Sequence, residues 1–384
     1  MAGTTLLAGC QSDSKSSADG KTGSGSDAPA ATPTIDPALI AFSPANKATK
    51  VRLDKKLKVK VDKGTLATVT VTTAKGKAVA GKISADKLTW SSTSNLAPGT
   101  KYKMSVEAAA ADGSTTTKTS SFKTLTPKST AYASIQPGDG WVVGVGMPVR
   151  VDFSRSVADR NKAKVAAALT VKTTTNLEGS WRWVGSQQVQ WRPKKYWPSG
   201  TKVKVTSNLA GVELQKGVWG TSKRTSDFKI GDEVISTVDV AAHTLTMRKN
   251  GKVVKKIPVT TGKASMATRN GIKVIMSRET VHRMRSSTIG IKKGDPDYYD
   301  IKAEYAMRVT NSGEFLHAAP WSTGSQGQAN VSHGCTGMST ADAKWIFNHS
   351  KVGDVVVYKN SNRKLETDNG YTAWNMSYDR WKNA

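Results

Sequence analysis

Cysteine, acidic residues and long apolar runs are all scarce in this chain. The 384 residues include two cysteines, Cys10 and Cys335, which excludes the close-spaced cysteine pairs of a zinc finger. Beyond the N-terminal leader-like stretch, no apolar run approaches the ~20 residues that a membrane-spanning helix requires. Asp and Glu number 29 against 57 Lys and Arg, leaving a net charge of +28.

This positive charge favours polyanions such as nucleic acid, an anionic membrane surface or acidic wall polymers. The lysines are scattered through alternating segments such as "KVKVDKG" and "KVKVTSN", a pattern typical first of solvated sheet faces and only second of a docking surface. Because no zinc finger, RNA-recognition motif or basic helix accompanies them, a nucleic-acid partner is not predicted.

The N-terminus contains Leu7-Ala8-Gly9-Cys10, which resembles the lipobox of bacterial lipoproteins. A polar Ser/Gly/Ala/Asp tract follows, too poor in large apolar residues to fold. We therefore predict lipidation at Cys10 and a flexible linker through residue 36, with a chance cysteine as the alternative. If Cys10 carries lipid, Cys335 stays a free thiol in an exported protein.

The next part of the sequence contains an internal repeat of about 100 residues. Trp90 corresponds to Trp191 and Phe122 to Phe228, each within short alternating runs broken by Gly, Pro and Asn. This alternation is typical of antiparallel strands packed as a sandwich. We predict two immunoglobulin-like β-sandwiches, at residues 37–126 and 127–231.

The second repeat is rich in tryptophan, with four indoles that suit either a carbohydrate-stacking platform or the core: Trp181, Trp183, Trp191 and Trp197. Strand spacing favours the core. Neither repeat contains a catalytic constellation, so we interpret both as a spacer.

Residues 232–360 differ from the two repeats in sequence pattern. We predict a β-rich domain with a few short helices. Two alternating strands flank Asn250-Gly251, a dipeptide suited to a type I′ hairpin. A helix is predicted after Ser339, with Asp342 near its positive end. Cys335 would then lie just ahead of a helix start, where the dipole favours a thiolate.

The surroundings of Cys335 suit nucleophilic catalysis. A cysteine nucleophile needs a base and N–H donors for the oxyanion, and the chain offers His317, His333 and the unhindered backbone at Gly334. An inert buried thiol is one alternative, and a zinc site of His317, His333 and Cys335 is another. The remaining histidines, His243, His282 and His349, are interpreted as surface or packing residues.

The segment "FLHAAPWSTGSQGQANVSHGCTGMS" resembles the active-site motif of the L,D-transpeptidases, the YkuD family. The layout of lipobox, linker, two immunoglobulin-like domains, catalytic domain and a Trp-rich tail at 361–384 is similar to actinobacterial members. This resemblance spans nearly the whole chain.

The resemblance implies a role for individual residues. Cys335 would be the nucleophile and His317 the base, held by the carbonyl of Ala318, with Gly334 and Cys335 N–H groups as oxyanion candidates. Further positions are implied to shape the pocket or contact substrate: Ser332, His333, Met284, Tyr299, Trp321, Thr336 and Gly337. Many members carry Asn where this chain has Gly337, so the amide donor is missing.

The implied reaction is acyl transfer without a metal or cofactor. The family releases D-alanine from a peptidoglycan tetrapeptide stem, holds the stem as a thioester and passes it to a side-chain amine of another stem. Carbapenem-type β-lactams would acylate the same cysteine, and cell-wall biogenesis and cell shape would depend on the activity. Alternatives are an L,D-carboxypeptidase and a non-catalytic wall-binding lipoprotein, whereas a sortase would need an arginine shortly after Cys335 and none precedes Arg363.

Overall fold

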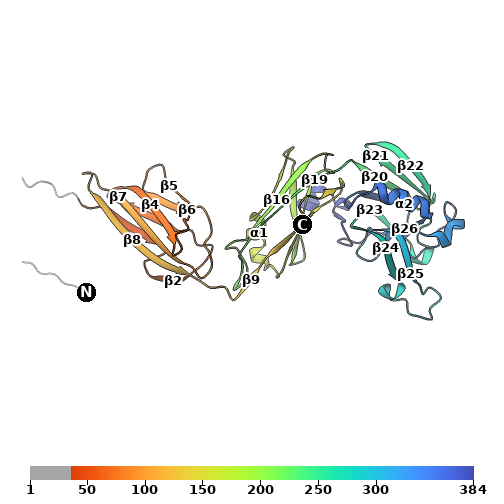
Figure 1. Ribbon diagram of the computed structural model, residues 1–384, viewed down its shortest axis with the longest axis horizontal. Helices are drawn as coiled ribbons and strands as arrows, with labels where there is room; N and C mark the ends of the chain where they lie inside the picture. Colours follow the sequence, from red (N-terminus) through yellow and green to blue (C-terminus); the bar gives the residue numbers. More distant parts are fainter. Residues whose placement is uncertain (1–35) are drawn as a thin grey trace, which may run out of the picture.

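The computed structural model describes residues 36–384, so the predicted lipidation site at Cys10 lies outside the described residues. Two β-sandwiches and a larger β-rich domain follow one another along the long axis of the molecule (Figure 1). The fold is mainly β with few helices, as the sequence predicts. Within the described part, no helix has the length and apolar character needed to cross a membrane.

The first sandwich consists of two four-stranded sheets. One has the order β1 (Leu39–Ser43), β3 (Lys58–Asp62), β6 (Thr89–Ser92) and β5 (Gly81–Ile83). The other has the order β2 (Ala48–Val51), β8 (Thr115–Thr124), β7 (Lys101–Ala109) and β4 (Thr65–Thr73). Alternate residues of β7 are buried, so Tyr102 faces inward and its ring stacks on Phe122 at a centroid distance of 5.0 Å.

The second sandwich repeats the plan and adds a helix. One sheet has the order β10 (Ala133–Gln136), β12 (Val149–Phe153), β15 (Gln188–Pro193) and β14 (Gly179–Val184). The other has the order β11 (Val142–Val143), β19 (Lys223–Ile230), β16 (Lys202–Asn208) and β13 (Leu169–Thr173). A small sheet of β17 (Glu213–Gln215), β18 (Val218–Gly220) and β9 (Ser129–Ala131) and helix α1 (Asp159–Ala167) complete it. Trp191 and Trp197 are buried in its core, as predicted.

The third domain is built on two sheets. The six-stranded sheet has the order β22 (Lys252–Pro258), β21 (Thr244–Lys249), β20 (Val234–Asp239), β28 (Val355–Lys359), β23 (Arg269–Val274) and β29 (Arg363–Lys364). The four-stranded sheet has the order β24 (Ser277–Arg285), β25 (Asp300–Arg308), β26 (Phe315–Ala318) and β27 (Thr336–Met338). Helical segments are η1 (Ala264–Met266), η2 (Ser286–Ile289), η3 (Pro320–Ser325), α2 (Thr340–His349), η4 (Ala373–Asn375) and α3 (Tyr378–Lys382).

Two local predictions for this domain are confirmed. Asn250 and Gly251 have φ values of 49° and 80° at the β21–β22 turn, as a type I′ hairpin requires. Ser339 caps α2 by accepting a hydrogen bond from the N–H of Asp342 at 3.1 Å.

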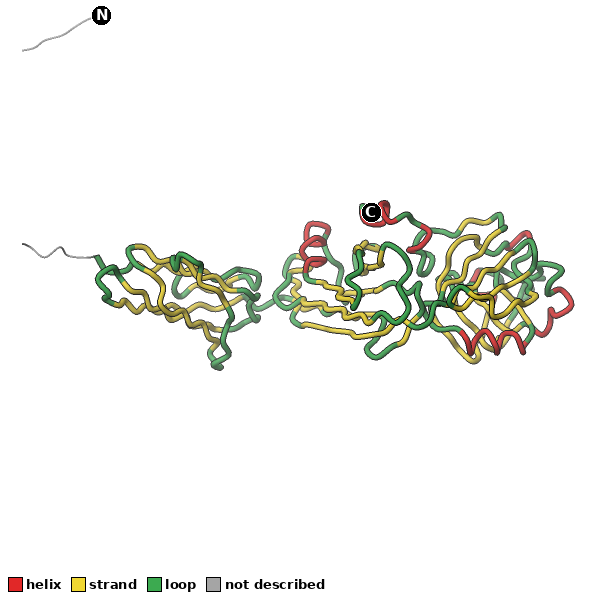
Figure 2. Tube along the Cα trace, turned by 90° about the horizontal axis from the view of Figure 1, so that it is seen from above, coloured by secondary structure: helices red, strands yellow, loops and turns green. Residues whose placement is uncertain are grey.

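After β29 has paired with β23 of the third domain, the chain returns to the second sandwich, and the C-terminus lies over it (Figure 2). The indole of Trp374 donates to the carbonyl of Gly146 at 2.7 Å, and that of Trp381 donates to Ser180 at 3.0 Å. Between these two rings lies the buried guanidinium of Arg192, 4.9 Å and 5.3 Å from their centroids. Cation–π attraction is strongest when the cation is desolvated, so this tail fastens the third domain to the second sandwich.

Candidate active site

The register of two parallel strands brings Cys335 and His317 to one face of a sheet. β26 pairs with β27 such that Leu316 lies beside Thr336 and His317 beside Gly337. Successive side chains of a strand point to opposite faces, so Cys335 and His317 share the face opposite to Leu316 and Thr336. Leu316 belongs to the hydrophobic core, and both Cys335 and His317 line one cavity.

The imidazole of His317 is buried and held in one tautomer. Its Nδ1 lies 2.7 Å from the carbonyl oxygen of Ala318, which can only accept, so Nδ1 carries the proton and Nε2 has a free lone pair. Burial lowers the pKa of His317, and the Ala318 hydrogen bond opposes this only in part. His317 is therefore neutral at neutral pH, the state that a general base requires.

The thiol of Cys335 is partly buried and neutral. It donates to the carbonyl of Gly313 at a distance of 3.7 Å, and burial raises the pKa of Cys335 to about 11. The prediction of a thiolate stabilised by a helix dipole is wrong, because β27 separates Cys335 from the start of α2. Within residues 36–384, no hydrogen bond joins the thiol to His317.

The loop before Cys335 is braced by its own polar groups. The hydroxyl of Ser332 donates to the carbonyl of Cys335 at 2.7 Å and accepts from the N–H of Gly334 at 3.1 Å. Gly334 has a φ of +122°, which disfavours any side chain there. The N–H of Gly334 is thus engaged by Ser332, and the N–H groups of Gly334 and Cys335 stay the predicted donors to the oxyanion.

The cavity in front of the thiol has a volume of about 310 Å³. Its walls include the predicted residues Met284, Tyr299, Trp321, Ser332, His333 and Gly337, together with Thr260, Ile301, Ala319, Ser322 and Val331. The exposed ring of Trp321 lies 6.0 Å from the imidazole of His317. One prediction fails here: Thr336 is fully buried on the opposite face and its hydroxyl bonds to that of Tyr358 at 2.8 Å, so it does not reach the cavity.

Gly337 is confined from two sides. Its N–H and carbonyl pair with the carbonyl and N–H of Thr260, both at 2.9 Å, while His317 lies beside it on the other side. A Cβ built on Gly337 would lie 2.8 Å from the Cβ of Ala319, closer than side-chain carbons approach. The absence of a side chain at this position thus permits the close approach of the segment that follows His317.

An ion-pair clasp links the cavity to the loop that covers it. We call residues 286–299, between β24 and β25, the flap. Asp297 of the flap pairs with the ammonium of Lys263 and lies 3.3 Å from Nε2 of His333, and the rings of Tyr299 and His333 lie 5.0 Å apart. The Lys263 hydrogen bond lowers the pKa of Asp297, so this carboxylate is charged at neutral pH and loses the clasp only in acid.

A buried charged network behind Cys335 was missed by sequence reasoning. Lys273 and Glu314, both almost fully buried, lie 2.5 Å apart, and Arg269 pairs with the same carboxylate at 3.1 Å. Burial lowers the pKa of Lys273 to about 8 against the opposing pull of Glu314. The one available signal was a lysine inside the apolar run "GIKVIM", where an unpaired charge would be costly.

The other predicted residues lie apart from this arrangement. His243 bonds to Asn330, His282 pairs with Glu279, and His349 lies 2.7 Å from the carbonyl of Trp345. For the described residues, no group of three or more His, Cys, Asp or Glu side chains is arranged to hold a metal ion. Cys335 and His317 line one cavity, together with the flap residue Tyr299.

Two family models match the chain. A bacterial Ig domain matches residues 48–213, and the L,D-transpeptidase catalytic domain, YkuD, matches residues 233–357. L,D-transpeptidase 2 of Mycobacterium tuberculosis is 39% identical over 346 residues, covering 89% of this chain and 84% of that protein. L,D-transpeptidase 5 of the same species is 33% identical over 350 residues, covering 89% and 76%.

Solved structures give the same result. An LD transpeptidase in complex with imipenem is 39% identical with a TM-score of 0.52, covering 61% of this chain and all of that one. L,D-transpeptidase 3 from Mycobacterium tuberculosis, in complex with a faropenem-derived adduct, is 32% identical with a TM-score of 0.50, covering 59% and 97%. The chain belongs to the L,D-transpeptidase family, and its class is that of a cysteine-dependent acyltransferase.

We predict that Gly337→Ala lowers activity more than stability. The added methyl group must displace Ala319, and with it the strand end that carries His317. Overpacking costs about 1–3 kcal/mol of folding free energy. Misplacing the base should slow acylation by a carbapenem about tenfold or more, measured by mass spectrometry of the adduct.

The matched control is Gly324→Ala in η3, because a Cβ there meets no atom within 4 Å. It should leave both the acylation rate and the unfolding temperature unchanged. Acylation of the Gly337 variant at the rate of the unmodified chain would show that the close packing at this position is immaterial.

We predict that Asp297→Asn loosens the flap. Removing the carboxylate leaves Lys263 and His333 without their shared partner, and should slow acylation about two- to fivefold, as expected for a solvent-exposed ion pair. The remaining rate should be less sensitive to salt than that of the unmodified chain.

Asp300→Asn is the control, since Asp300 pairs with Arg283 on the same hairpin but outside the cavity. Equal rates for the two variants would argue against a role of the clasp in covering the cavity.

Proposed function

We propose that this chain cross-links peptidoglycan stem peptides through a thioester on Cys335. The observation that carries the proposal is that the pairing of β26 with β27 brings His317 and Cys335, the residue just before β27, into the wall of one cavity. Cys335 is the nucleophile, His317 is the base, and the carbonyl of Ala318 fixes the imidazole.

The first half-reaction transfers one proton from sulfur to nitrogen. Sγ of Cys335 attacks the carbonyl carbon of the third, diamino-acid residue of a tetrapeptide stem, while Nε2 of His317 takes the thiol proton. The carbon–nitrogen bond to D-alanine then breaks, and His317 gives its proton to the leaving amine. A neutral Cys335 and a neutral His317 suit this sequence, because the thiol need not ionise before the substrate arrives.

The second half-reaction reverses these roles. A side-chain amine of another stem attacks the thioester, His317 accepts a proton from that amine, and sulfur leaves to recover its proton from the imidazolium. We propose that the N–H of Cys335 stabilises the oxyanion in both steps, and the hydrogen bond from the Ser332 hydroxyl to the Cys335 carbonyl, which holds this loop, supports that role.

The residues of the cavity wall are proposed to contact the stem peptide. Met284 and the flap residue Tyr299 line the cavity, Trp321 stands beside His317, and His333 lies 3.3 Å from Asp297 of the flap. Gly337 supplies no side-chain amide, so we propose that backbone groups rather than an Asn side chain hold the substrate at that point.

We further propose that the enzyme works outside the cytoplasmic membrane and is anchored by lipid on Cys10. A wall substrate demands an extracytoplasmic site, and the two sandwiches lie between residue 36 and the catalytic domain (Figure 1). Carbapenem-type β-lactams are expected to acylate Cys335. Cell-wall biogenesis and cell shape would follow from the cross-links, and the +28 charge would favour contact with anionic wall polymers.

The test is to incubate the chain carrying Cys10→Ser with disaccharide-tetrapeptide and to analyse the products by mass spectrometry. We expect cross-linked dimers lighter by one D-alanine, and none from the same chain carrying Cys335→Ala as well. Monomers that lose D-alanine without forming dimers would instead identify an L,D-carboxypeptidase. An unchanged substrate, together with no carbapenem adduct, would leave a wall-binding lipoprotein and overturn the catalytic proposal.

A further inference from the structure

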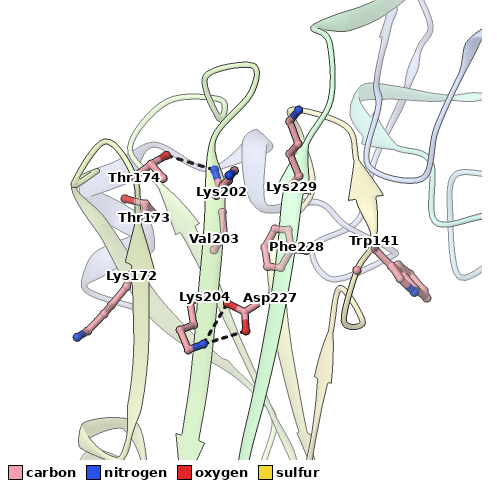
Figure 3. A pocket seen from close by; sticks show the side chains of 11 residues that line it. Trp141, Lys172, Thr173, Thr174, Lys202, Val203, Lys204, Asp227, Phe228 and Lys229 are labelled. Atoms are coloured by element: carbon pink, nitrogen blue, oxygen red, sulfur yellow. Dashed lines mark hydrogen bonds and ion pairs between the residues drawn. The ribbon is translucent and has the colours of Figure 1, made fainter.

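The outer face of the second sandwich carries lysines placed directly opposite one another. In the sheet β11-β19-β16-β13, Lys172 of β13 pairs in register with Lys204 of β16, and Lys202 of β16 pairs with Lys229 of β19. Like charges directly opposite on neighbouring strands destabilise a sheet. Two such pairs side by side concentrate positive charge on one strip of surface (Figure 3).

Only one of these four lysines is neutralised within the strip. The ammonium of Lys204 lies 2.9 Å from a carboxylate oxygen of Asp227. Among residues 36–384, no carboxylate forms an ion pair with Lys172, Lys202 or Lys229. Three cations therefore stay available to an anionic ligand.

The strip is also hollowed and has an aromatic border. It forms a groove of about 460 Å³ that includes these lysines, Thr173, Thr174 and Trp141. Trp141 lies on the far side of β19 from Lys204 and is 47% exposed (Figure 3). The N–H of Lys229 donates to the carbonyl of Trp141 at 2.9 Å, so the backbone of the tryptophan is tied to β19, the strand that carries Lys229.

We propose that this groove binds an acidic polysaccharide. Its carboxylate or phosphate groups pair with Lys172, Lys202 and Lys229, while the C–H face of a sugar ring packs on the electron-rich face of the Trp141 indole. Single-stranded nucleic acid would require several stacking aromatics, and the groove has one exposed ring. None of these residues lines the cavity of Cys335, so the inference goes beyond catalysis.

The first sandwich provides an internal comparison. Its strands β7 and β8 place Lys101 beside Lys123, in the position that corresponds to Lys202 and Lys229. There, however, Lys103 lies between Thr72 and Ser121, where the second sandwich has Lys172 and Asp227 beside Lys204. Removing lysines from the first sandwich therefore removes equal charge without touching the proposed groove.

The experiment measures binding of the full chain carrying Cys10→Ser to polygalacturonate, as a function of salt, with neutral dextran as the blank. The groove variant combines Lys172→Gln, Lys202→Gln and Lys229→Gln. It should lower the affinity about tenfold or more at low salt and reduce the slope of log affinity against log salt by about 3.

The charge-matched control combines Lys101→Gln, Lys103→Gln and Lys123→Gln. It should keep most of the affinity of the parent chain. Trp141→Ala alone should lower the affinity about fivefold or more and leave the salt slope unchanged, because it removes packing and no charge. Carbapenem acylation should be the same in all three variants, and the unfolding temperature should not fall in the two lysine variants, because both remove opposed like charges. This separates the inference from the proposed catalytic function.

Three results would overturn the proposal. If the groove variant and its control lose equal affinity for polygalacturonate, the binding depends on the overall charge of the chain and not on the groove. Undiminished binding in the groove variant would place the site elsewhere. A loss of binding to vesicles of anionic lipid, without a loss for polygalacturonate, would make the strip a membrane contact.

Discussion

The pairing of β26 with β27 is the constraint on which the site depends. A shift of one residue in this register would turn Cys335 or His317 into the core and expose Leu316 or Thr336. The core residues on the other face resist that shift, because Leu316 and Met338 are both fully buried. Hydrophobic burial on one face thus fixes the alignment of the reacting groups on the other.

The same burial decides the electrostatic state of the pair. It raises the pKa of Cys335 to about 11 and lowers that of His317, so both groups are uncharged before substrate binds. The buried Lys273 lies in the same region but is matched with Glu314 at 2.5 Å, which limits its pull on the thiol. Proton transfer within the complex, rather than a preformed thiolate, is the mechanism that this environment favours.

Sequence reasoning reached the parts of the structure that depend on local chemistry. Asn250-Gly251 indicates a hairpin because both residues accept positive φ, and Ser339 indicates a helix start because its side chain can cap one. The Cys/His motif indicates the residues that line the cavity. Sequence reasoning failed where the outcome depends on a neighbouring strand. The short strand β27 was not foreseen, so Thr336 was assigned to the wrong face and Cys335 was expected directly before the helix rather than before a strand. The pairs Lys273–Glu314 and Lys263–Asp297 join residues 41 and 34 positions apart, and no local pattern predicts such contacts.

The state of the Cys335 thiol in the free enzyme tests this account most directly. The chain carrying Cys10→Ser has Cys335 as its one cysteine, so the rate of alkylation by iodoacetamide reports on that thiol alone. A pKa of about 11 predicts a rate that rises about tenfold per pH unit from neutral pH upward, without a plateau before about pH 10. A plateau near neutral pH that disappears in His317→Ala would contradict the account, because it would reveal a preformed thiolate and imidazolium pair.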